Sequence, residues 1–263
     1  MPRIAFRAGL AASAIALLCA WSTSSSPLPR FRPSPRGVVL PILMYHRVGT
    51  DAASSPSITR ALTVSPSDFA AQMRWLHASG YHAVTQGQLL GALLLGLPLP
   101  PRPVMITFDD GYRDVLWNAA PILHRLHMPA TAYVITGRIS GSDSSFLTWG
   151  ELAQLERLGF TIGSHTVHHV DLTLEPPESA YSELVDSKHV LEQRLHRPVP
   201  WFAYPAGRFD PAVVAEAARA GYLLAVTTQP GFLQQNRLEL HRFEILDTTG
   251  RNGLKALLAS NAR

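Results

Sequence analysis

Residues 104–111, which read VMITFDDG, decide the fold of this chain. The apolar run at 104–108 has the length and composition of a buried strand, and the Asp-Asp-Gly that follows has the composition of a turn. Similar apolar runs recur along the chain and alternate with segments whose apolar residues are spaced as in a helix. Repeated βα units of this length predict a parallel sheet, either open or closed as a barrel.

This alternation extends from residue 38 to residue 226. Strands are expected at 38–44, 81–84, 104–108, 130–135, 160–163, 201–204 and 222–226. Helices are expected at 66–80, 86–95, 115–126, 148–159, 178–195 and 211–220, with a loop at 49–64. Ligands of parallel sheets and barrels bind at the carboxyl ends of the strands. Four polar residues stand at such ends and are expected to share one rim, namely His46, Asp109, Asp110 and His165.

The bulk composition fits one globular domain. The chain has 263 residues, 46% of them hydrophobic, which is enough for a single α/β domain with a full core. The formal net charge is +4, and much of the positive excess lies near the start of the chain. We find no basic cluster with interleaved aromatic residues, so the sequence predicts no nucleic-acid partner.

The first residues have the pattern of an export signal. Arg3 and Arg7 precede an apolar run at 8–21, which is short for a membrane span. Residues 1–21 are therefore expected to be a signal peptide or, because the cleavage site is poor, an uncleaved inner-membrane anchor. Residues 22–37, rich in Ser, Pro and Arg, are expected to be a disordered linker to a domain at 38–263. This organisation predicts an exported protein, periplasmic or secreted, with a membrane tether if the signal is retained.

A second motif, residues 164–169, reads SHTVHH and follows the expected strand at 160–163. His165 and His169 are four residues apart, so in a helical turn both can face one ion. Two imidazoles and one carboxylate from Asp109 or Asp110 leave an open position on a metal, as catalytic zinc sites do. Zn²⁺ is the default ion, and the same ligands also accept Co²⁺, Ni²⁺ or Fe²⁺. The alternatives are an ordinary Asp-Gly turn and histidines exposed in a surface loop.

The two motifs together resemble the polysaccharide deacetylases of the NodB-homology type, carbohydrate esterase family 4. The resemblance extends over about residues 40–245 and implies a single-domain, distorted (β/α)₇ barrel that hydrolyses N-acetyl groups on amino sugars. It also implies that Asp109 is the catalytic base and that Asp110, His165 and His169 bind the metal. The residues alone do not say which of the two aspartates has which role.

The sequence departs from the family pattern at a third motif. Residues 202–207 read FAYPAG where the family has Phe-Arg-Pro-Pro-Tyr-Gly, so Ala203 replaces the arginine that holds the base. Ala206 replaces a tyrosine whose backbone N–H helps to hold the oxyanion, and a backbone donor survives that change. Tyr204 is a candidate for substrate contact or for the core.

The family's C-terminal Leu-x-His motif is also missing. Residues 43–46, which read LMYH, and residues 241–245, which read HRFEI, resemble instead the subgroup that acts on exported poly-N-acetylglucosamine. In that subgroup His46 would supply the acid that protonates the departing amine. The expected substrate is thus an N-acetylated polysaccharide. The alternatives are peptidoglycan, another C–N amide bond, or, because Ala203 lacks a guanidinium, an inactive glycan-binding module.

Overall fold

The computed structural model of this protein describes residues 37–50 and 54–260. The expected signal or anchor at 1–21 and the expected linker at 22–37, apart from Gly37, lie outside the described residues. Within the described part, no helix combines the length and the apolar character needed to cross a membrane.

The centre of the molecule is a curved sheet of eight strands, all of them parallel. Its order is β10-β9-β8-β7-β6-β2-β12, and β5 also pairs with β6. The strands are β2 (Ile42–Tyr45), β5 (His82–Ala83), β6 (Pro103–Phe108), β7 (Ala130–Val134), β8 (Phe160–Ser164), β9 (Trp201–Ala203), β10 (Leu224–Val226) and β12 (Phe243–Glu244). Two short pairs accompany the sheet, β1 (Val38–Val39) with β11 (Leu233–Gln234) and β3 (Arg47–Val48) with β4 (Thr63–Val64).

One segment connects the two edges of this sheet. Leu240 forms an isolated parallel bridge with Val226 of β10, and three residues later Phe243 pairs with Leu43 of β2. Residues 240–244 therefore lie between β10 and β2 and close the sheet into a distorted barrel. The expected (β/α)₇ architecture is confirmed.

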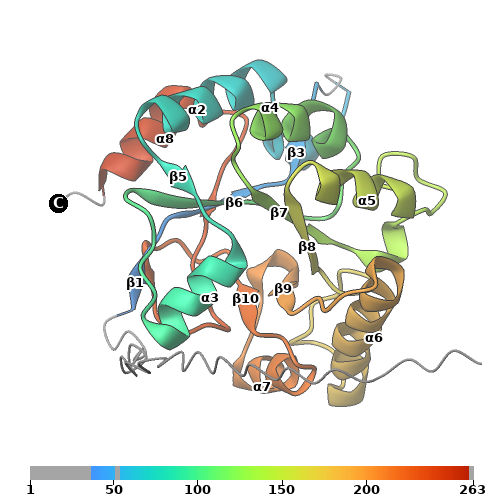
Figure 1. The fold of residues 1–263 in the computed structure, drawn as a ribbon. Coiled ribbons are helices and arrows are strands. Elements are labelled where there is room, and N and C mark those ends of the chain that lie inside the picture. The colour runs from blue at the N-terminus through green and yellow to red at the C-terminus, as the bar shows by residue number, and fades with distance from the viewer. Residues whose placement is uncertain (1–36, 51–53, 261–263) are drawn as a thin grey trace, which may run out of the picture. The chain divides into compact units, whose positions relative to one another are not determined.

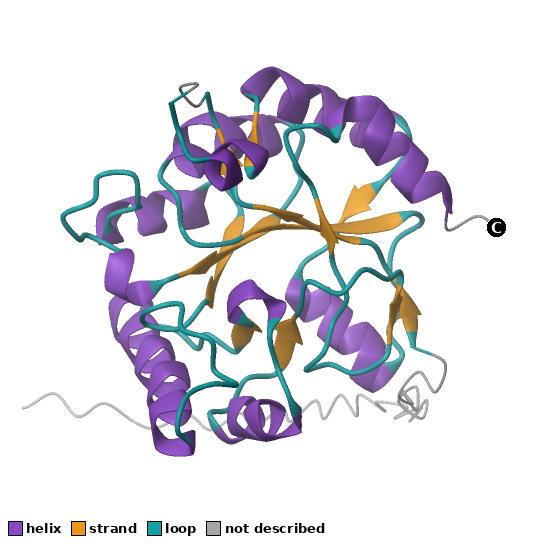
Figure 2. Ribbon diagram, turned by 180° about the vertical axis from the view of Figure 1, so that it is seen from behind, coloured by secondary structure: helices purple, strands orange, loops and turns teal. Residues whose placement is uncertain are grey.

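Helices surround the sheet, as Figures 1 and 2 show from opposite sides. They are α1 (Ser57–Ala61), α2 (Pro66–Ala78), α3 (Gln86–Leu95), α4 (Ala120–Arg125), α5 (Trp149–Arg157), α6 (Pro177–Leu195), α7 (Pro211–Arg219) and α8 (Gly250–Ala259). A π-helical turn, η1 (Val115–Ala119), leads into α4, and two 3₁₀ turns are η2 (Thr136–Arg138) and η3 (Pro205–Gly207). Local sequence sets several helix starts. Thr85 and Thr148 form capping boxes, and Ser65 and Asp210 accept from the first turns of α2 and α7.

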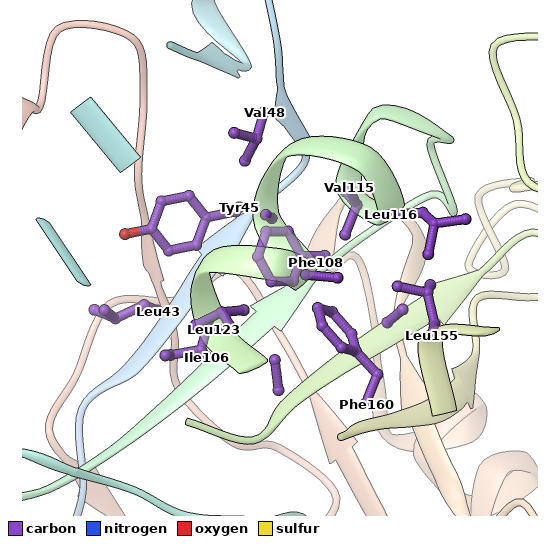
Figure 3. Packing of buried hydrophobic residues seen from close by; sticks show 14 of the residues in the cluster. Leu43, Tyr45, Val48, Ile106, Phe108, Val115, Leu116, Leu123, Leu155 and Phe160 are labelled. Atoms are coloured by element: carbon purple, nitrogen blue, oxygen red, sulfur yellow. The ribbon is translucent and has the colours of Figure 1, made fainter. Parts of the chain in front are cut away.

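The main core fills the space between one face of the sheet and the helices η1, α2, α4, α5 and α8. Figure 3 shows its centre, where the rings of Tyr45, Phe108 and Phe160 lie beside Leu123 and Leu155. The centroids of the Tyr45 and Phe108 rings are 5.5 Å apart, and those of Phe108 and Phe160 are 5.7 Å apart. These residues fix the strands whose next residues form the rim.

The structure differs from the sequence-based expectations in short elements. The run at 38–44 is two strands interrupted at Leu40 and Pro41, because proline has no N–H for a strand ladder. The expected loop at 49–64 contains α1 and ends in β4, which pairs with β3. Strands of two residues are too short to show a period. The elements β11, β12 and α8, beyond residue 226, were not predicted.

Candidate active site

The strand ends bring the predicted residues together. Asp109 and Asp110 follow β6, while His46 follows β2 and His165 follows β8. Sharp turns follow β6 and β8, since Asp110 and Thr166, each two residues after its strand, have left-handed φ angles of 72° and 65°. Asp109 and His165 are each only 2% exposed. This burial excludes the two alternatives, an ordinary surface turn at Asp109 and a surface loop at His165.

Asp110, His165 and His169 form a set that can hold a metal. One ligand atom from each lies within 4.8 Å of the others. The Nε2 atoms of His165 and His169 are 3.5 and 3.7 Å from the same Asp110 oxygen, Oδ1. Their ring centroids are 4.7 Å apart at 75°. Two imidazole nitrogens and one carboxylate oxygen, with His169 partly exposed, match a three-ligand catalytic site with an open position.

A hydrogen bond fixes the orientation of His165. Its Nδ1 lies 2.7 Å from the carbonyl oxygen of Ala203, so Nδ1 carries the proton and Nε2 presents its lone pair toward Asp110. Burial lowers the pKa of His165, against the opposing effect of Asp109 and Asp110. The imidazole is thus held neutral, which is the form that binds a metal.

The loop that carries the two histidines is held by one carboxylate on α6. Oε2 of Glu183 accepts from the backbone N–H groups of Val167 and His168, both at 2.9 Å. Oε1 of Glu183 lies 2.6 Å from Nδ1 of His168. His168 is 68% exposed and directed to Glu183, so it lies outside the metal set, as its spacing predicted.

A fully buried arginine holds Asp109. The guanidinium of Arg242 donates to both Asp109 oxygens, from Nη1 to Oδ1 at 2.7 Å and from Nη2 to Oδ2 at 2.6 Å. Nη1 also donates to Thr107 Oγ1 at 3.2 Å, and Nε donates to the Thr227 carbonyl at 2.7 Å. This is the bidentate geometry in which arginine binds a carboxylate most strongly.

The pKa of Asp109 reflects two opposing effects. Burial raises it, whereas the charge and hydrogen bonds of Arg242, with smaller contributions from His165 and His46, lower it further, to about 2. Asp109 is therefore ionised at any working pH. Each of its oxygens accepts from Arg242 and keeps a second lone pair for a proton.

His46 lies at the same end of the barrel. Tyr45 of β2 pairs with Phe108 of β6, so His46 and Asp109 are the next residues on two adjacent strands. Among the described residues, Nδ1 of His46 is buried and has no hydrogen-bond partner. No loop carbonyl in the described part of the chain therefore accepts a hydrogen bond from this nitrogen.

The two candidate residues of the third motif, Ala206 and Tyr204, lie in different environments. Ala206 is exposed in η3 with φ 51°, three residues after the Ala203 carbonyl that orients His165. Tyr204, in contrast, is fully buried, stacks on Phe209 at 5.3 Å and donates from its hydroxyl to the Leu238 carbonyl at 3.0 Å. Tyr204 thus belongs to the core, and its expected contact with substrate is corrected, because no part of its side chain reaches the surface.

Comparisons with known proteins show the family to which the chain belongs. The Polysaccharide deacetylase family model matches residues 96–225. YxkH of Bacillus subtilis, named as a polysaccharide deacetylase, is 34% identical over 210 residues, which cover 78% of this chain and 71% of that protein. The chain belongs to the polysaccharide deacetylase family.

Two further relatives define its place in that family. The solved structure of deacetylase PplD of Streptococcus pyogenes, in complex with acetate, superposes with a TM-score of 0.77 at 31% identity, over 84% of this chain and 98% of that one. The poly-beta-1,6-N-acetyl-D-glucosamine N-deacetylase of Staphylococcus aureus is 26% identical over 64% of this chain and 62% of its own length. This polysaccharide deacetylase is accordingly a carbohydrate esterase family 4 hydrolase of the NodB type, which acts on N-acetyl groups.

The sequence reasoning missed Arg242 as a site residue. Two signals pointed to it. Ala203 leaves the base without the guanidinium that the family provides, and residues 241–245 already stood out as similar to one subgroup. Only the barrel closure shows that this segment reaches Asp109.

Proposed function

We propose that this polysaccharide deacetylase removes N-acetyl groups from a poly-N-acetylglucosamine chain in a metal-dependent reaction. The observation that carries the proposal is the ionised Asp109, fixed by Arg242 beside the His/His/Asp set, with His46 at the same strand ends. The choice of polymer is supported by the similarity to the Staphylococcus aureus enzyme and by the Tyr-His at residues 45–46.

The donor set fits a divalent cation held by Asp110, His165 and His169. When bound there, such an ion supplies Lewis-acid activation of a water molecule and of the acetamide carbonyl. Zn²⁺ is the default, and Co²⁺, Ni²⁺ and Fe²⁺ suit the same ligands.

The protein residues then move the protons. Asp109 takes a proton from water as the water oxygen bonds to the carbonyl carbon. The backbone N–H of Ala206 donates to the oxygen on which negative charge develops. His46 gives a ring proton to the nitrogen as the C–N bond breaks. The products are acetate and a glucosamine unit, and proton exchange with solvent restores both side chains.

Acetate release from metal-loaded protein tests this function. We expect release from poly-β-1,6-N-acetylglucosamine, loss of release after chelation, and recovery on adding back one divalent ion. Peptidoglycan and chitin serve as parallel substrates. Release from peptidoglycan alone would overturn the substrate, and binding without release from any of them would support the inactive module.

We also propose that the enzyme is exported through residues 1–21. Arg3, Arg7 and the apolar run at 8–21 support this proposal. A reporter fused after Gly37 is expected outside the cytoplasm, and its retention in the cytoplasm would contradict export. Fractionation of the mature protein with membrane or with periplasm separates an anchor from a cleaved signal.

A further inference from the structure

Two stacked aromatic rings beside the metal set each lie under a guanidinium. The rings of Tyr112 and Phe146 are parallel to within 22°, and their centroids are 4.8 Å apart. The Arg47 guanidinium lies 4.9 Å from the Tyr112 centroid, and that of Arg138 lies 5.5 Å from the Phe146 centroid. We call these four residues the Arg–aromatic stack.

The stack is tied to the segment that follows the two catalytic-site aspartates. Tyr112 comes two residues after Asp110 and forms an antiparallel bridge with Phe146. On either side of that bridge, the Arg113 N–H donates to the Ser145 carbonyl at 2.7 Å and the Leu147 N–H donates to the Gly111 carbonyl at 3.0 Å. The stack is therefore held in a fixed position relative to the metal set.

Two hollows lie against the stack. The first, about 340 Å³, is lined by all four stack residues together with Thr59, Asp143 and Ser145. The second, about 430 Å³, is lined by Arg138 and Asp143 and extends to Val167 and His168, which lie between the metal-binding histidines in sequence. Because they share Arg138 and Asp143, the hollows are neighbours, and the second reaches the loop that carries His165 and His169. Each has the volume of a small-ligand site (~300–1,000 Å³).

The charges around the first hollow balance. Arg47 Nε donates to Asp114 Oδ2 at 2.7 Å. Hydrogen bonds from Ser145 lower the pKa of Asp143, so its carboxylate is ionised near the exposed Arg138. Two cations thus face two carboxylates. The hollow thus offers guanidinium donors, carboxylate acceptors and an aromatic edge, and it carries no excess charge. This lining suits a neutral sugar ring, because sugar hydroxyls need both hydrogen-bond donors and acceptors.

We infer that the Arg–aromatic stack is a subsite for a neutral N-acetylhexosamine unit next to the one that is deacetylated. The inference rests on the proposed function, because it takes the same polymer as substrate. With this subsite the enzyme binds the reacting sugar unit together with its neighbour, and Arg138 contacts the neighbouring unit.

A length series of substrates tests the subsite. Acetate release is measured on the N-acetylglucosamine monomer and the β-1,6-linked pentamer with metal-loaded wild type, Arg138→Ala and Arg157→Ala. Arg157 is an exposed arginine at the end of α5 and serves as the matched control. We expect Arg138→Ala to lower kcat/KM for the pentamer by ~10-fold, the factor that one lost contact to a charged group produces, and by clearly less for the monomer, which has no neighbouring unit. Arg157→Ala should follow wild type at both lengths.

An equal loss on both lengths, or no loss, would overturn the subsite. So would a loss that appears only with uronate- or phosphate-bearing glycans. If wild type releases no acetate at all, the proposed function fails, and the subsite is then tested by binding alone. In the Asp109→Asn background, pentamer Kd should weaken ~10-fold on adding Arg138→Ala, and an unchanged Kd would overturn the inference.

Discussion

Replacing Arg242 by methionine removes the cation that holds Asp109, the proposed catalytic base. Arg242 and Asp109 are both buried, and the guanidinium contacts both carboxylate oxygens. Removing one partner of a buried pair leaves a charge without compensation and typically costs ~3–5 kcal/mol. Since whole domains are stable by only ~5–15 kcal/mol, Arg242→Met should lower the free energy of unfolding severely while some folded protein remains.

The stability of the wild type should depend on pH through the same pair. The pKa of Asp109 is lowered from 3.8 to about 2 in the folded protein, which corresponds to ~2 kcal/mol of stability. Because the folded pKa is the lower one, this contribution is complete above about pH 4 and is lost as the pH falls toward 2. In Arg242→Met the burial of Asp109 is no longer offset by the guanidinium, so the pKa should rise and this contribution should vanish.

Urea unfolding at a series of pH values, on metal-free protein, measures both effects. Metal is removed because a cation beside Asp109 would itself act on the pKa of that residue. Arg237→Met is the matched control, since Arg237 donates to the carbonyls of Tyr222 and Leu223 and does not contact Asp109. The control should lose some stability without changing its dependence on pH between 4 and 2.

Activity gives a second measure of the same substitution. With Asp109 misplaced and harder to ionise, kcat should fall by up to the ~10²–10⁴ that a general base contributes. The acid limb of the pH–rate profile should move to higher pH. Arg242→Met protein that is folded and metal-loaded, with near-normal kcat and an unchanged profile, would refute the reasoning that Arg242 holds the base.

Three further substitutions separate the roles of the remaining residues. His169→Ala should lose bound metal strongly while His168→Ala retains it, and the reverse result in metal analysis would show that the ligand pairing is wrong. Glu183→Gln lacks the two anionic oxygens that hold His168 and the loop amides. It should weaken metal affinity ~10–100-fold in a chelator competition. Asp186→Asn, at an exposed position on the same helix, is the control and should not weaken it. His46→Ala should keep fold and metal but lose ~10²–10⁴ in kcat and the alkaline limb of the profile, so normal turnover would exclude the acid role.

The fold was accessible from the sequence because its main elements carry strong local signals. The expected strands at 104–108, 130–135 and 160–163 differ from β6, β7 and β8 by one residue at most at either end. The helix at 86–95 matches α3, whose capping box at Thr85 fixes its start. The two-residue strands β3, β4, β11 and β12 escaped detection, since their pairing is set by tertiary contacts and not by a local period.

The metal set was accessible for a similar reason. Its three residues come from two compact motifs, and the parallel topology alone brings the ends of β6 and β8 to one edge. Tyr204 could not be assigned in the same way, because an aromatic residue after a strand can face inward or outward. Its burial depends on Phe209 and Leu238, which lie in segments that the pattern around Tyr204 does not include.

The position of Arg242 shows why the loss of one motif residue need not mean loss of activity. The family places its arginine at the position that Ala203 occupies here, whereas this chain supplies a guanidinium from the segment that closes the barrel. That segment bridges to β10 at Leu240 and pairs with β2 at Phe243, so the Arg242 between them enters the barrel at the level of Asp109. The argument for an inactive module depended on the missing guanidinium, and it therefore loses its basis. The arrangement also couples the base to the fold, because Arg242 can hold Asp109 only while residues 240–244 join the two edges of the sheet.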